Sequence, residues 1–581
     1  MIWTIFAWIY ILLLAYALGV FLHSRIVKLF GVAADTDLHF SLKCITGLVA
    51  IDFMSTVLCL FIPLGLVSSL IILCLALVIY FFERENISLA FKKDRQRLKD
   101  GNWLIILIFV AFIFIIAYLS FLPSSHYDDG LYYSTSIKWL EEYGTAKGLA
   151  NLNPRIGFNS SWLILQANFG FQFLKLGLFN DLNGLFLLLV FLYSLGGVNN
   201  MLKGDISLKT IVRSLFLLPA LVCHFGATSD IILFNINFLG SPTPDISVCV
   251  LLWLIFLLFI EGYLSNKQVI ALSDILIVIY SVWAFSIKLS AVPVFLLVLY
   301  ICWKWIAGKR YRQLVFLISI GLIFILPWIV RNVLLTGYLF FPFSGIDVFN
   351  VLWKLPMQDV KWHENAVKSF AIGADINKPY TIPLTQWFPS WFVKQEFIHQ
   401  VILGFDILST FVFALIGTIN LALGRISFLK NNQRIVLFIL AAFAGIWFWI
   451  MKAPDFRFGY GFLCIYMVLT LALLFKSFLE ERVRYIYLPI ILFMIAIGFI
   501  YYKTVWISIQ PFFARPIAYR VPKETKQINI PNKPTIYLVQ HEDSWNCTLP
   551  VANEAEYYFI KPVFIGSTIQ EGFKSNESVR P

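Results

Sequence analysis

Long apolar runs are the feature that most constrains this chain. Many of them reach or exceed about 18 residues, the length at which a helix crosses the hydrocarbon core of a bilayer. The chain has 581 residues, of which 60% are hydrophobic and only 13% are charged. A soluble protein carries roughly twice that charged fraction. Segments of about ten residues with alternating polarity, the mark of an outer-membrane barrel, are absent. The sequence therefore predicts an all-α polytopic membrane protein.

About fourteen spans are predicted, with boundaries good to a few residues. The first run, "MIWTIFAWIYILLLAYALGVFL", lacks a positive n-region and a small-residue cleavage site. We therefore interpret it as a spanning helix and not as a removed signal peptide. The predicted spans are 2–22, 41–62, 66–83, 103–121, 182–201, 211–228, 243–263, 268–287, 290–306, 314–331, 401–423, 434–452, 459–475 and 485–503.

Basic residues concentrate between spans and predict the orientation of the chain. "ERENISLAFKKDRQRLKD", "GKRYRQ", "GRISFLKNNQR" and "KSFLEERVRY" all fall on one side when fourteen spans alternate. Short basic loops face the cytoplasm, so both termini are expected outside, together with long segments at 122–181, 332–400 and 504–581. The net charge of +12 then serves orientation, and no nucleic-acid partner is expected.

Three regions follow from this layout. Residues 1–100 form a transmembrane extension of three spans, and residues 101–503 form a transmembrane core with external loops. Residues 504–581 are expected to form a small external α/β domain, because "PTIYLVQ" and "EYYFIKPVFIG" are typical of short strands. Seven of the eight cysteines lie in or near spans without metal-ligand spacing, which indicates small core residues.

The first external loop is predicted to carry two interfacial helices. "YSTSIKWLEEYG" has helical spacing of apolar and charged residues, with Gly144 as a C-terminal stop, and indicates an amphipathic helix on the membrane. The apolar residues 160–178 are interrupted by Gln166, Asn168 and Gly170. We interpret them as a second interfacial helix. A re-entrant helix is the alternative, and a full span there would invert everything that follows.

Asp128 and Asp129 stand side by side just after a predicted span, in "SSHYDDGLYYSTSIKWLEEYG". Adjacent carboxylates raise one another's pKa, and such a group can act as a general base or bind a divalent cation. The structural alternative is a helix N-terminus that favours acidic residues. His126 either tunes the neighbouring aspartate or is a hydrogen-bonding surface group.

Further ionisable and polar residues recur at the predicted external ends of spans. Each alone is more typical of an interfacial anchor or ion pair, but together they indicate a site, since ionisable groups at membrane depth are usually functional. Lys288, Arg331 and Arg457 suit a phosphate or pyrophosphate. No motif of a soluble enzyme competes with this interpretation. The other polar residues at these predicted external ends are Asp245, Asn332, Lys452 and Asp455.

The order of these motifs resembles the GT-C superfamily of membrane glycosyltransferases, which use polyprenyl-phosphate-linked sugars, and in particular a subgroup of bacterial multi-pass proteins. "DDGLY" keeps the first Asp and the Tyr of an Asp-Glu-Ala-x-Tyr motif, with Asp129-Gly130 in place of Glu-Ala. "WIVRNVLLTGYLFFPF" is similar to an Arg-Asn…Thr-Gly…Pro segment of such proteins, and "SPTPD", "KLSAVP" and "PDFRFGYG" resemble motifs of the subgroup. The resemblance covers about residues 100–475.

The resemblance implies an inverting sugar transfer on the external face of a bacterial inner membrane, in the biosynthesis of a cell-envelope polysaccharide. Asp128 and Asp129 are the implied catalytic residues, and Asp128 is favoured as the base. Lys288, Arg331 and Arg457 would bind the donor phosphate. The expected partners are the polyprenyl-phosphate-sugar donor, a glycan, lipid or protein acceptor, and membrane lipids. The implied supporting residues are His126, Tyr132, Arg155, Asp245, Asn332 and Asp455.

Alternatives stay open at this point. Some relatives use a divalent cation, and no cluster of metal ligands decides the matter here, so no metal-binding residue is assigned. A glycan polymerase or ligase would use similar donors. A transporter or flippase for a lipid-linked saccharide would place polar residues near the bilayer midplane, whereas here they gather at one face. An assembly protein would not need converging Asp, Lys and Arg.

Overall fold

The computed structural model contains a bundle of long apolar helices. Eleven helices in the described residues are long and apolar enough to cross a membrane, so this is a polytopic helical membrane protein. The described residues are 1–32, 37–122, 124, 126–174, 182–216, 239–265, 271–376, 382–425, 427, 432–478, 521–522, 524–540 and 544–576. The eleven are α1 (Ile2–Phe30), α2 (Phe40–Leu58), α3 (Leu66–Lys99), α4 (Trp103–Phe121), α7 (Leu182–Leu202), α10 (Pro244–Ser265), η5 (Leu289–Val294) continued by α12 (Phe295–Ala307), α13 (Tyr311–Thr336), α16 (Phe397–Ala422), α18 (Gln433–Lys452) and α19 (Phe456–Phe478).

Each of the eleven coincides with a predicted span, which confirms the helical membrane class. A shorter apolar helix, α11 (Leu272–Ile287), lies on the predicted span 268–287. The helix α8 (Leu208–Leu215) covers the start of the predicted span 211–228. The rest of that span, and all of 485–503, lie outside the described residues. The total of fourteen therefore stays a prediction.

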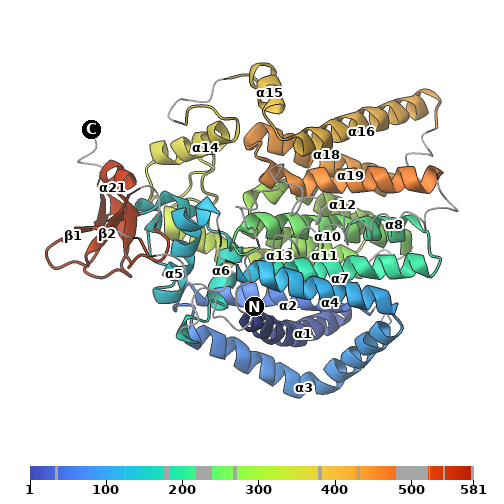
Figure 1. Cartoon of the computed structure of the whole chain (residues 1–581), viewed down its shortest axis with the longest axis horizontal. Helices are drawn as coiled ribbons and strands as arrows, with labels where there is room; N and C mark the ends of the chain where they lie inside the picture. The colour runs from blue at the N-terminus through green and yellow to red at the C-terminus, as the bar shows by residue number, and fades with distance from the viewer. Residues whose placement is uncertain are drawn as a thin grey trace.

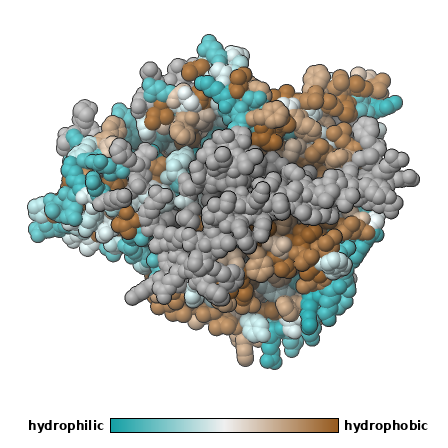
Figure 2. Space-filling view, in the orientation of Figure 1, coloured by the Kyte–Doolittle hydropathy of each residue, from teal (hydrophilic) through white to brown (hydrophobic). Residues whose placement is uncertain are grey.

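The spanning helices lie side by side with their axes along one common direction (Figure 1). The helix α10 is the most enclosed of them, whereas α13 and α16 are mostly exposed. Brown, hydrophobic side chains lie on the bundle at the upper right and lower centre, and hydrophilic ones lie over the strands at the left, at the top and at the lower right (Figure 2). This distribution fits a bundle whose outer helices face lipid and whose polar region projects beyond one end.

The helices α1 and α2 approach each other closely because both carry glycine at the contact. A Cβ atom on Gly19 would lie 1.8 Å from the Lys43 carbonyl oxygen, and one on Gly47 would lie 1.8 Å from the Ala15 carbonyl oxygen. Small residues allow such close backbone packing of helices in membranes. The contact fixes the N-terminal pair of helices against each other.

The helix α3 differs from the sequence-based expectation. The basic segment after residue 83, predicted as a loop, continues as helix to Lys99, with a kink at Glu83 (φ −110°, ψ 16°). The segment is rich in Leu, Lys, Arg and Gln, which all favour helix, and the last turn carries Arg97 and Lys99, which suit a helix C-terminus. The positive charge of this segment predicted its place between spans but not its helical structure.

The segment between α4 and α7 consists of short helices. The helix α6 has eight residues and is about 12 Å long at 1.5 Å per residue, too short to span a bilayer. The described part of residues 160–178 therefore does not cross the membrane as one helix. The short helices between α4 and α7 are the π-helix η1 (Asp129–Tyr133), α5 (Ser134–Glu142), the 3-10 helices η2 (Leu149–Asn151), η3 (Pro154–Phe158) and η4 (Gln172–Leu174), and α6 (Ser161–Asn168).

The helix α5 was predicted to lie on the membrane, and the structure corrects this. Its Trp139 is completely buried and shares a hydrophobic cluster with Ile536, Leu538 and Phe573 of the C-terminal region. The apolar face is therefore covered by protein and is not available to lipid. The predicted end of the helix is confirmed, because Gly144 follows it with a φ of 71°.

Two small sheets form the C-terminal region. In the first, β2 pairs antiparallel with β1 (Gln527 opposite Tyr537) and parallel with β3 (Leu538 opposite Ala552). In the second, β4 and β5 pair antiparallel, with Val563 opposite Lys574. The strands are β1 (Lys526–Ile528), β2 (Ile536–Val539), β3 (Val551–Asn553), β4 (Pro562–Phe564) and β5 (Phe573–Ser575).

The C-terminal prediction was half right. "PTIYLVQ" contains β2, as expected, but "EYYFIKPVFIG" begins as the helix α21 (Glu554–Ile560) and only then forms β4. The Asn553 side chain caps this helix by accepting from the amides of Ala555 and Glu556. That cap outweighs the strand preference of the two tyrosines and the phenylalanine that follow. Two further helices, α14 (Met357–Ala371) and α15 (Leu384–Val393), lie in the predicted external segment 332–400.

The described cysteines are all free thiols, and most are buried, as the sequence indicated. The eighth, Cys223, lies outside the described residues. The small apolar character of cysteine accounts for these positions.

The contact between α1 and α2 can be tested by adding one methyl group. We expect Gly47→Ala to destabilise the protein by about 1–3 kcal/mol, the usual effect of overpacking. The measurement is thermal unfolding of the purified full chain in detergent. Gly404→Ala in α16 is the matched control, since nothing lies within 4 Å of a Cβ there. Equal stability of the two variants would contradict the close contact.

Candidate functional site

The turn after α4 brings the two aspartates into place. The Asp128 amide donates to Nδ1 of His126 (3.2 Å), and the Asp129 amide donates to the His126 carbonyl oxygen (3.1 Å). Burial, with the nearby charge of Arg457, lowers the pKa of His126 to about 3. This histidine is therefore neutral near pH 7, and its ring orders the turn instead of supplying a proton.

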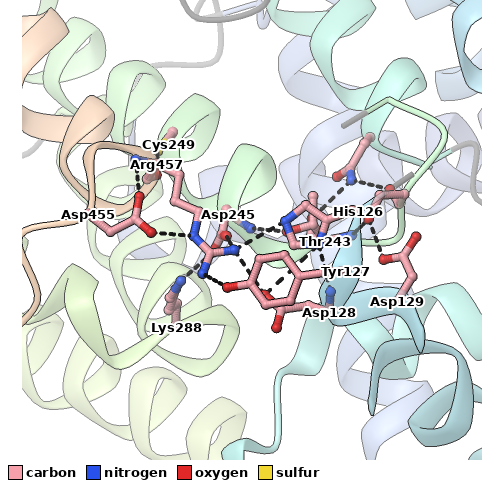
Figure 3. Close-up of polar contacts among 12 residues, drawn as sticks. His126, Tyr127, Asp128, Asp129, Thr243, Asp245, Cys249, Lys288, Asp455 and Arg457 are labelled. Carbon is pink, nitrogen blue, oxygen red and sulfur yellow. Dashed lines mark hydrogen bonds and ion pairs between the residues drawn. The ribbon is translucent and has the colours of Figure 1, made fainter. Parts of the chain in front are cut away.

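Asp128 and Asp129 point in different directions (Figure 3). Asp128 lines a cavity, and its Oδ2 lies 2.9 Å from a terminal nitrogen of Arg457. Asp129 is fully buried away from that cavity, and its Oδ1 accepts a hydrogen bond from the Ser241 hydroxyl (2.6 Å). The second carboxylate therefore does not share the position of the first.

The two aspartates also differ in their electrostatics. Burial raises the pKa of Asp129 to about 8, and hydrogen bonds from Ser124 and Ser241 oppose this only partly. Burial also raises the pKa of Asp128, while the Arg457 charge opposes the rise. Asp129 is consequently a neutral structural group near pH 7. Its predicted catalytic role has no geometric support from the cavity that Asp128 lines, because Asp129 is not among the residues of its wall.

Arg457 is the centre of the polar cluster (Figure 3). Its Nε donates to Asp455 (2.9 Å), one terminal nitrogen to Asp128, and the other to the Tyr127 hydroxyl (2.7 Å). Asp245 at the start of α10 lies 3.8 Å away. The guanidinium thus joins the loop after α4 to the first turns of α10 and α19.

Lys288 lies in the turn between α11 and η5 and forms an ion pair with Asp245. Its ammonium is also 3.4 Å from the ring centre of Phe458. Burial lowers the pKa of Lys288, and the Asp245 charge opposes that effect. Lys288 and Arg457 therefore both form ion pairs with carboxylates of the protein.

Arg331 is different, because no acidic side chain pairs with it among the described residues. It is 3% exposed. Its Nε donates to the Thr145 hydroxyl (3.2 Å), and a terminal nitrogen donates to the side-chain oxygen of Asn159. The adjacent Asn332 donates to the Leu339 carbonyl oxygen (2.8 Å) and accepts from Asn159, so it supports the backbone and the arginine.

Two further predicted residues line the same cavity from the first external loop. Tyr132 in η1 packs against Tyr133 at a tilt of 56°, with ring centres 4.4 Å apart. Arg155 in η3 forms an ion pair of 2.5 Å with Glu556 of α21. Arg155 therefore links the wall of the cavity to the C-terminal region.

The cavity itself encloses about 850 Å³ and is lined mainly by apolar and aromatic side chains. Asp128, Lys288, Arg331 and Arg457 all line it, and Asp455 and Arg155 join them. Exposed apolar residues such as Val292, Phe343 and Phe370 lie at its edge. The volume is in the range of small-molecule sites. The predicted residues at separate positions of the chain therefore do meet in one space.

Charged residues also occur away from this cavity, and the expectation that they gather at one face was wrong. Asp274 in α11 pairs with Lys304 (2.5 Å) and Arg434 (3.8 Å), and Lys43 in α2 pairs with Asp94 (2.9 Å). These residues lie near the opposite ends of their helices. They neutralise one another, which accounts for their burial without a ligand.

No group of three or more His, Cys, Asp or Glu side chains suited to a metal ion occurs in the part of the chain that the structure describes. Asp128, Asp245 and Asp455 do converge, but they surround the Arg457 guanidinium. Their negative charge is thus directed at a cation of the protein itself.

A family model described as a domain of unknown function (DUF8201) matches residues 1–464. The chain belongs to this family. The match contains every residue that lines the cavity. No curated protein and no solved structure matches the chain.

Sequence reasoning missed three residues of the site. Tyr127 contacts Arg457, Asn159 contacts Arg331, and Ser241 contacts Asp129. Tyr127 sits in the quoted motif, so its position beside Asp128 was a usable signal. Asn159 and Ser241 reach their partners only through folding, and nothing local distinguishes them.

The neutral state of Asp129 has a pH signature. A carboxyl whose pKa is raised in the folded state stabilises it fully at low pH, and this contribution is lost as pH rises to about 8. Asp129→Asn does not titrate and can still accept from Ser241. We therefore expect its melting temperature, relative to the parent, to rise between about pH 5 and pH 9. Asp100→Asn at an exposed position is the control, and a flat difference for Asp129→Asn would refute the neutral state.

Proposed function

We propose that the chain is a membrane glycosyltransferase of the GT-C type, which moves a sugar from a polyprenyl-phosphate-linked donor to an acceptor hydroxyl. The observation that carries the proposal is that Asp128, Arg331 and Arg457 line one cavity with apolar walls. Such a space suits an anionic head group attached to an apolar chain. A carboxylate at the same point suits acid–base chemistry.

Arg331 supports binding of an anion. A buried cation without an acidic partner carries a desolvation penalty of several kcal/mol, which an anionic ligand would offset. Its guanidinium can contact a phosphate with two parallel hydrogen bonds. Lys288 and Arg457 already pair with carboxylates, so we assign them a smaller share of phosphate binding than the sequence alone indicated. Their charges would still stabilise the leaving phosphate.

Asp128 has the geometry of a general base. In the proposed step, the acceptor oxygen forms a bond to the anomeric carbon while its proton passes to an Asp128 carboxylate oxygen. The bond from the anomeric carbon to the phosphate oxygen breaks, and the phosphate keeps the electron pair. Attack opposite the leaving group inverts the anomeric configuration. Burial raises the pKa of Asp128, and the Arg457 charge opposes this rise, which favours the ionised form that a base requires.

The number of spans and the orientation of the chain belong to the same proposal. We propose fourteen spans, with both termini and the C-terminal region outside and with the cavity on the external face of a bacterial inner membrane. The expected product is a glycan, glycolipid or glycoprotein of the cell envelope. A divalent cation is not needed in the step as written.

The role of Asp128 can be tested in a deletion strain whose missing glycan has been profiled. We expect Asp128→Asn to lower formation of that glycan by at least about 100-fold, because a general base contributes about 10²–10⁴-fold. The measurement is glycan yield per amount of membrane-inserted protein. Full transfer by Asp128→Asn would remove this residue from the mechanism.

A carrier for the same lipid-linked saccharide is the second candidate, because Asp406 within α16 is buried and neither of its carboxylate oxygens has a hydrogen-bond partner among the described residues. Unpaired carboxylates inside spans often mark transport pathways. Asp406→Asn is therefore the matched variant for Asp128→Asn. Loss of glycan with Asp406→Asn, together with normal yield from Asp128→Asn, would favour the carrier.

The role of Arg331 can be tested with farnesyl phosphate as a probe. Losing a hydrogen bond to a charged group costs about 1.5–3 kcal/mol, so Arg331→Gln should raise the dissociation constant about 10- to 100-fold. Binding to the full chain in detergent is measured by calorimetry, with farnesol as the uncharged control. Arg312→Gln, an exposed position at the start of α13, should leave the affinity unchanged. Equal affinities of Arg331→Gln and Arg312→Gln would contradict the assignment.

A further inference from the structure

The C-terminal region contacts the loop that carries Asp128 through several hydrogen bonds, three of which meet at one backbone oxygen. The amide and the hydroxyl of Ser544 donate to the Gly130 carbonyl oxygen at 2.8 and 2.7 Å. The Trp545 amide donates to the same oxygen at 3.2 Å. In return, the Ser134 hydroxyl donates to the Trp545 carbonyl oxygen at 3.1 Å. Both ends of the π-helix η1 are thereby held by two residues of the C-terminal region.

Glycine is required at position 130 because a side chain would clash, and not because of the backbone conformation. Gly130 is not among the glycines with a positive φ, so an L-residue could adopt its backbone angles. A Cβ atom there would, however, lie 2.5 Å from the indole nitrogen of Trp545 and 2.7 Å from a neighbouring ring carbon. The Trp545 ring thus occupies the space that a side chain at position 130 would need.

Trp545 itself is held in an unusual conformation. Its φ is +29°, which is rare for a bulky non-glycine residue, and its side chain is 9% exposed. Such strain persists only where the surrounding structure determines it, and it is often found near functional sites. The hydrogen bonds to Gly130 and Ser134 supply that determination.

Two further contacts connect the same C-terminal region to the first external loop. Arg155, which lines the cavity, pairs with Glu556. The Phe573 amide donates to the Lys147 carbonyl oxygen at 2.9 Å. The C-terminal region therefore also contacts the part of the loop that follows the segment carrying Asp128.

We propose that Trp545 is a positioning residue, which seats the Asp128 loop against Arg457 by packing its indole on Gly130. The C-terminal region, which lies outside the matched family model, then completes the site instead of only following it. The effect on transfer rests on the proposed function, whereas the effect on the loop does not. A misplacement of about 1 Å in such a site can lower a rate about 100-fold.

A pair of substitutions with complementary sizes tests this. We expect Gly130→Ala to lower glycan yield about 100-fold, because the new methyl displaces the indole. Trp545→Phe keeps the backbone hydrogen bonds but removes much of the ring that packs on Gly130, so it should lower the yield about tenfold. The double variant Gly130→Ala/Trp545→Phe should recover to within about tenfold. Yield is expressed per amount of membrane-inserted protein, because relief of the clash would also restore folding. Gly404→Ala is the matched glycine control.

Hydrogen exchange of the full chain in nanodiscs gives the readout that does not depend on transfer. We expect peptides within residues 126–142 to exchange at least about tenfold faster in Gly130→Ala, and at close to the parent rate in the double variant. Wild-type exchange in Gly130→Ala, or failure of Trp545→Phe to restore it, would overturn the positioning role. A third outcome separates the two proposals. If the double variant restores exchange but no variant changes the glycan yield, the contact between Trp545 and the loop is retained and the proposed function is refuted.

Discussion

The Arg457 guanidinium is the interaction on which the rest of the site depends. It contacts Asp128 from the loop after α4, Asp455 from the start of α19 and, at 3.8 Å, Asp245 from the start of α10. These groups come from three distant parts of the chain, and all are largely buried. Removing one partner from a buried ion pair is strongly destabilising, since it leaves an uncompensated charge. The same cation that stabilises the junction therefore orients Asp128 and opposes the rise in its pKa that burial causes.

The protein uses its acidic residues in two ways around this junction. Asp245 neutralises Lys288, and Asp129 is a neutral hydrogen-bonding group, whereas Asp128 and Asp455 both line the cavity and pair with Arg457. Arg331 is a cation of the same cavity that lacks an acidic partner among the described residues. Asp128 and Arg331 therefore face one space with apolar walls. The proposed ligand of that space is an anionic head group on an apolar chain.

Much of the fold follows from local patterns. The spans were predictable because a bilayer demands about 20 apolar residues per helix, and Gly144 was a usable stop signal. The helical end of α3 and the helix α21 were missed, because charge content and strand preference are weak guides beside helix-forming residues and an Asn553 cap. The burial of α5 was missed because its cover, including Phe573, lies more than 400 residues away.

The site was predictable as a set of residues but not as a network. Resemblance favoured Asp128 over Asp129, and the geometry places only the former in the cavity; its catalytic role stays a prediction. The pairing of Lys288 with Asp245, and the contact of Trp545 with Gly130, depend on tertiary packing that no local pattern encodes. The glycine in "DDGLY" was visible as a departure from a motif, but the ring that packs on it lies in the C-terminal region.

The most direct test of the account is an experimental structure of the full chain in nanodiscs with a polyprenyl phosphate bound. The account predicts that the phosphate lies within hydrogen-bond distance of the Arg331 or Arg457 guanidinium, with the Asp128 carboxylate in the same cavity and the prenyl chain along the apolar wall. A phosphate bound elsewhere on the protein, with this cavity closed to the ligand, would contradict the account.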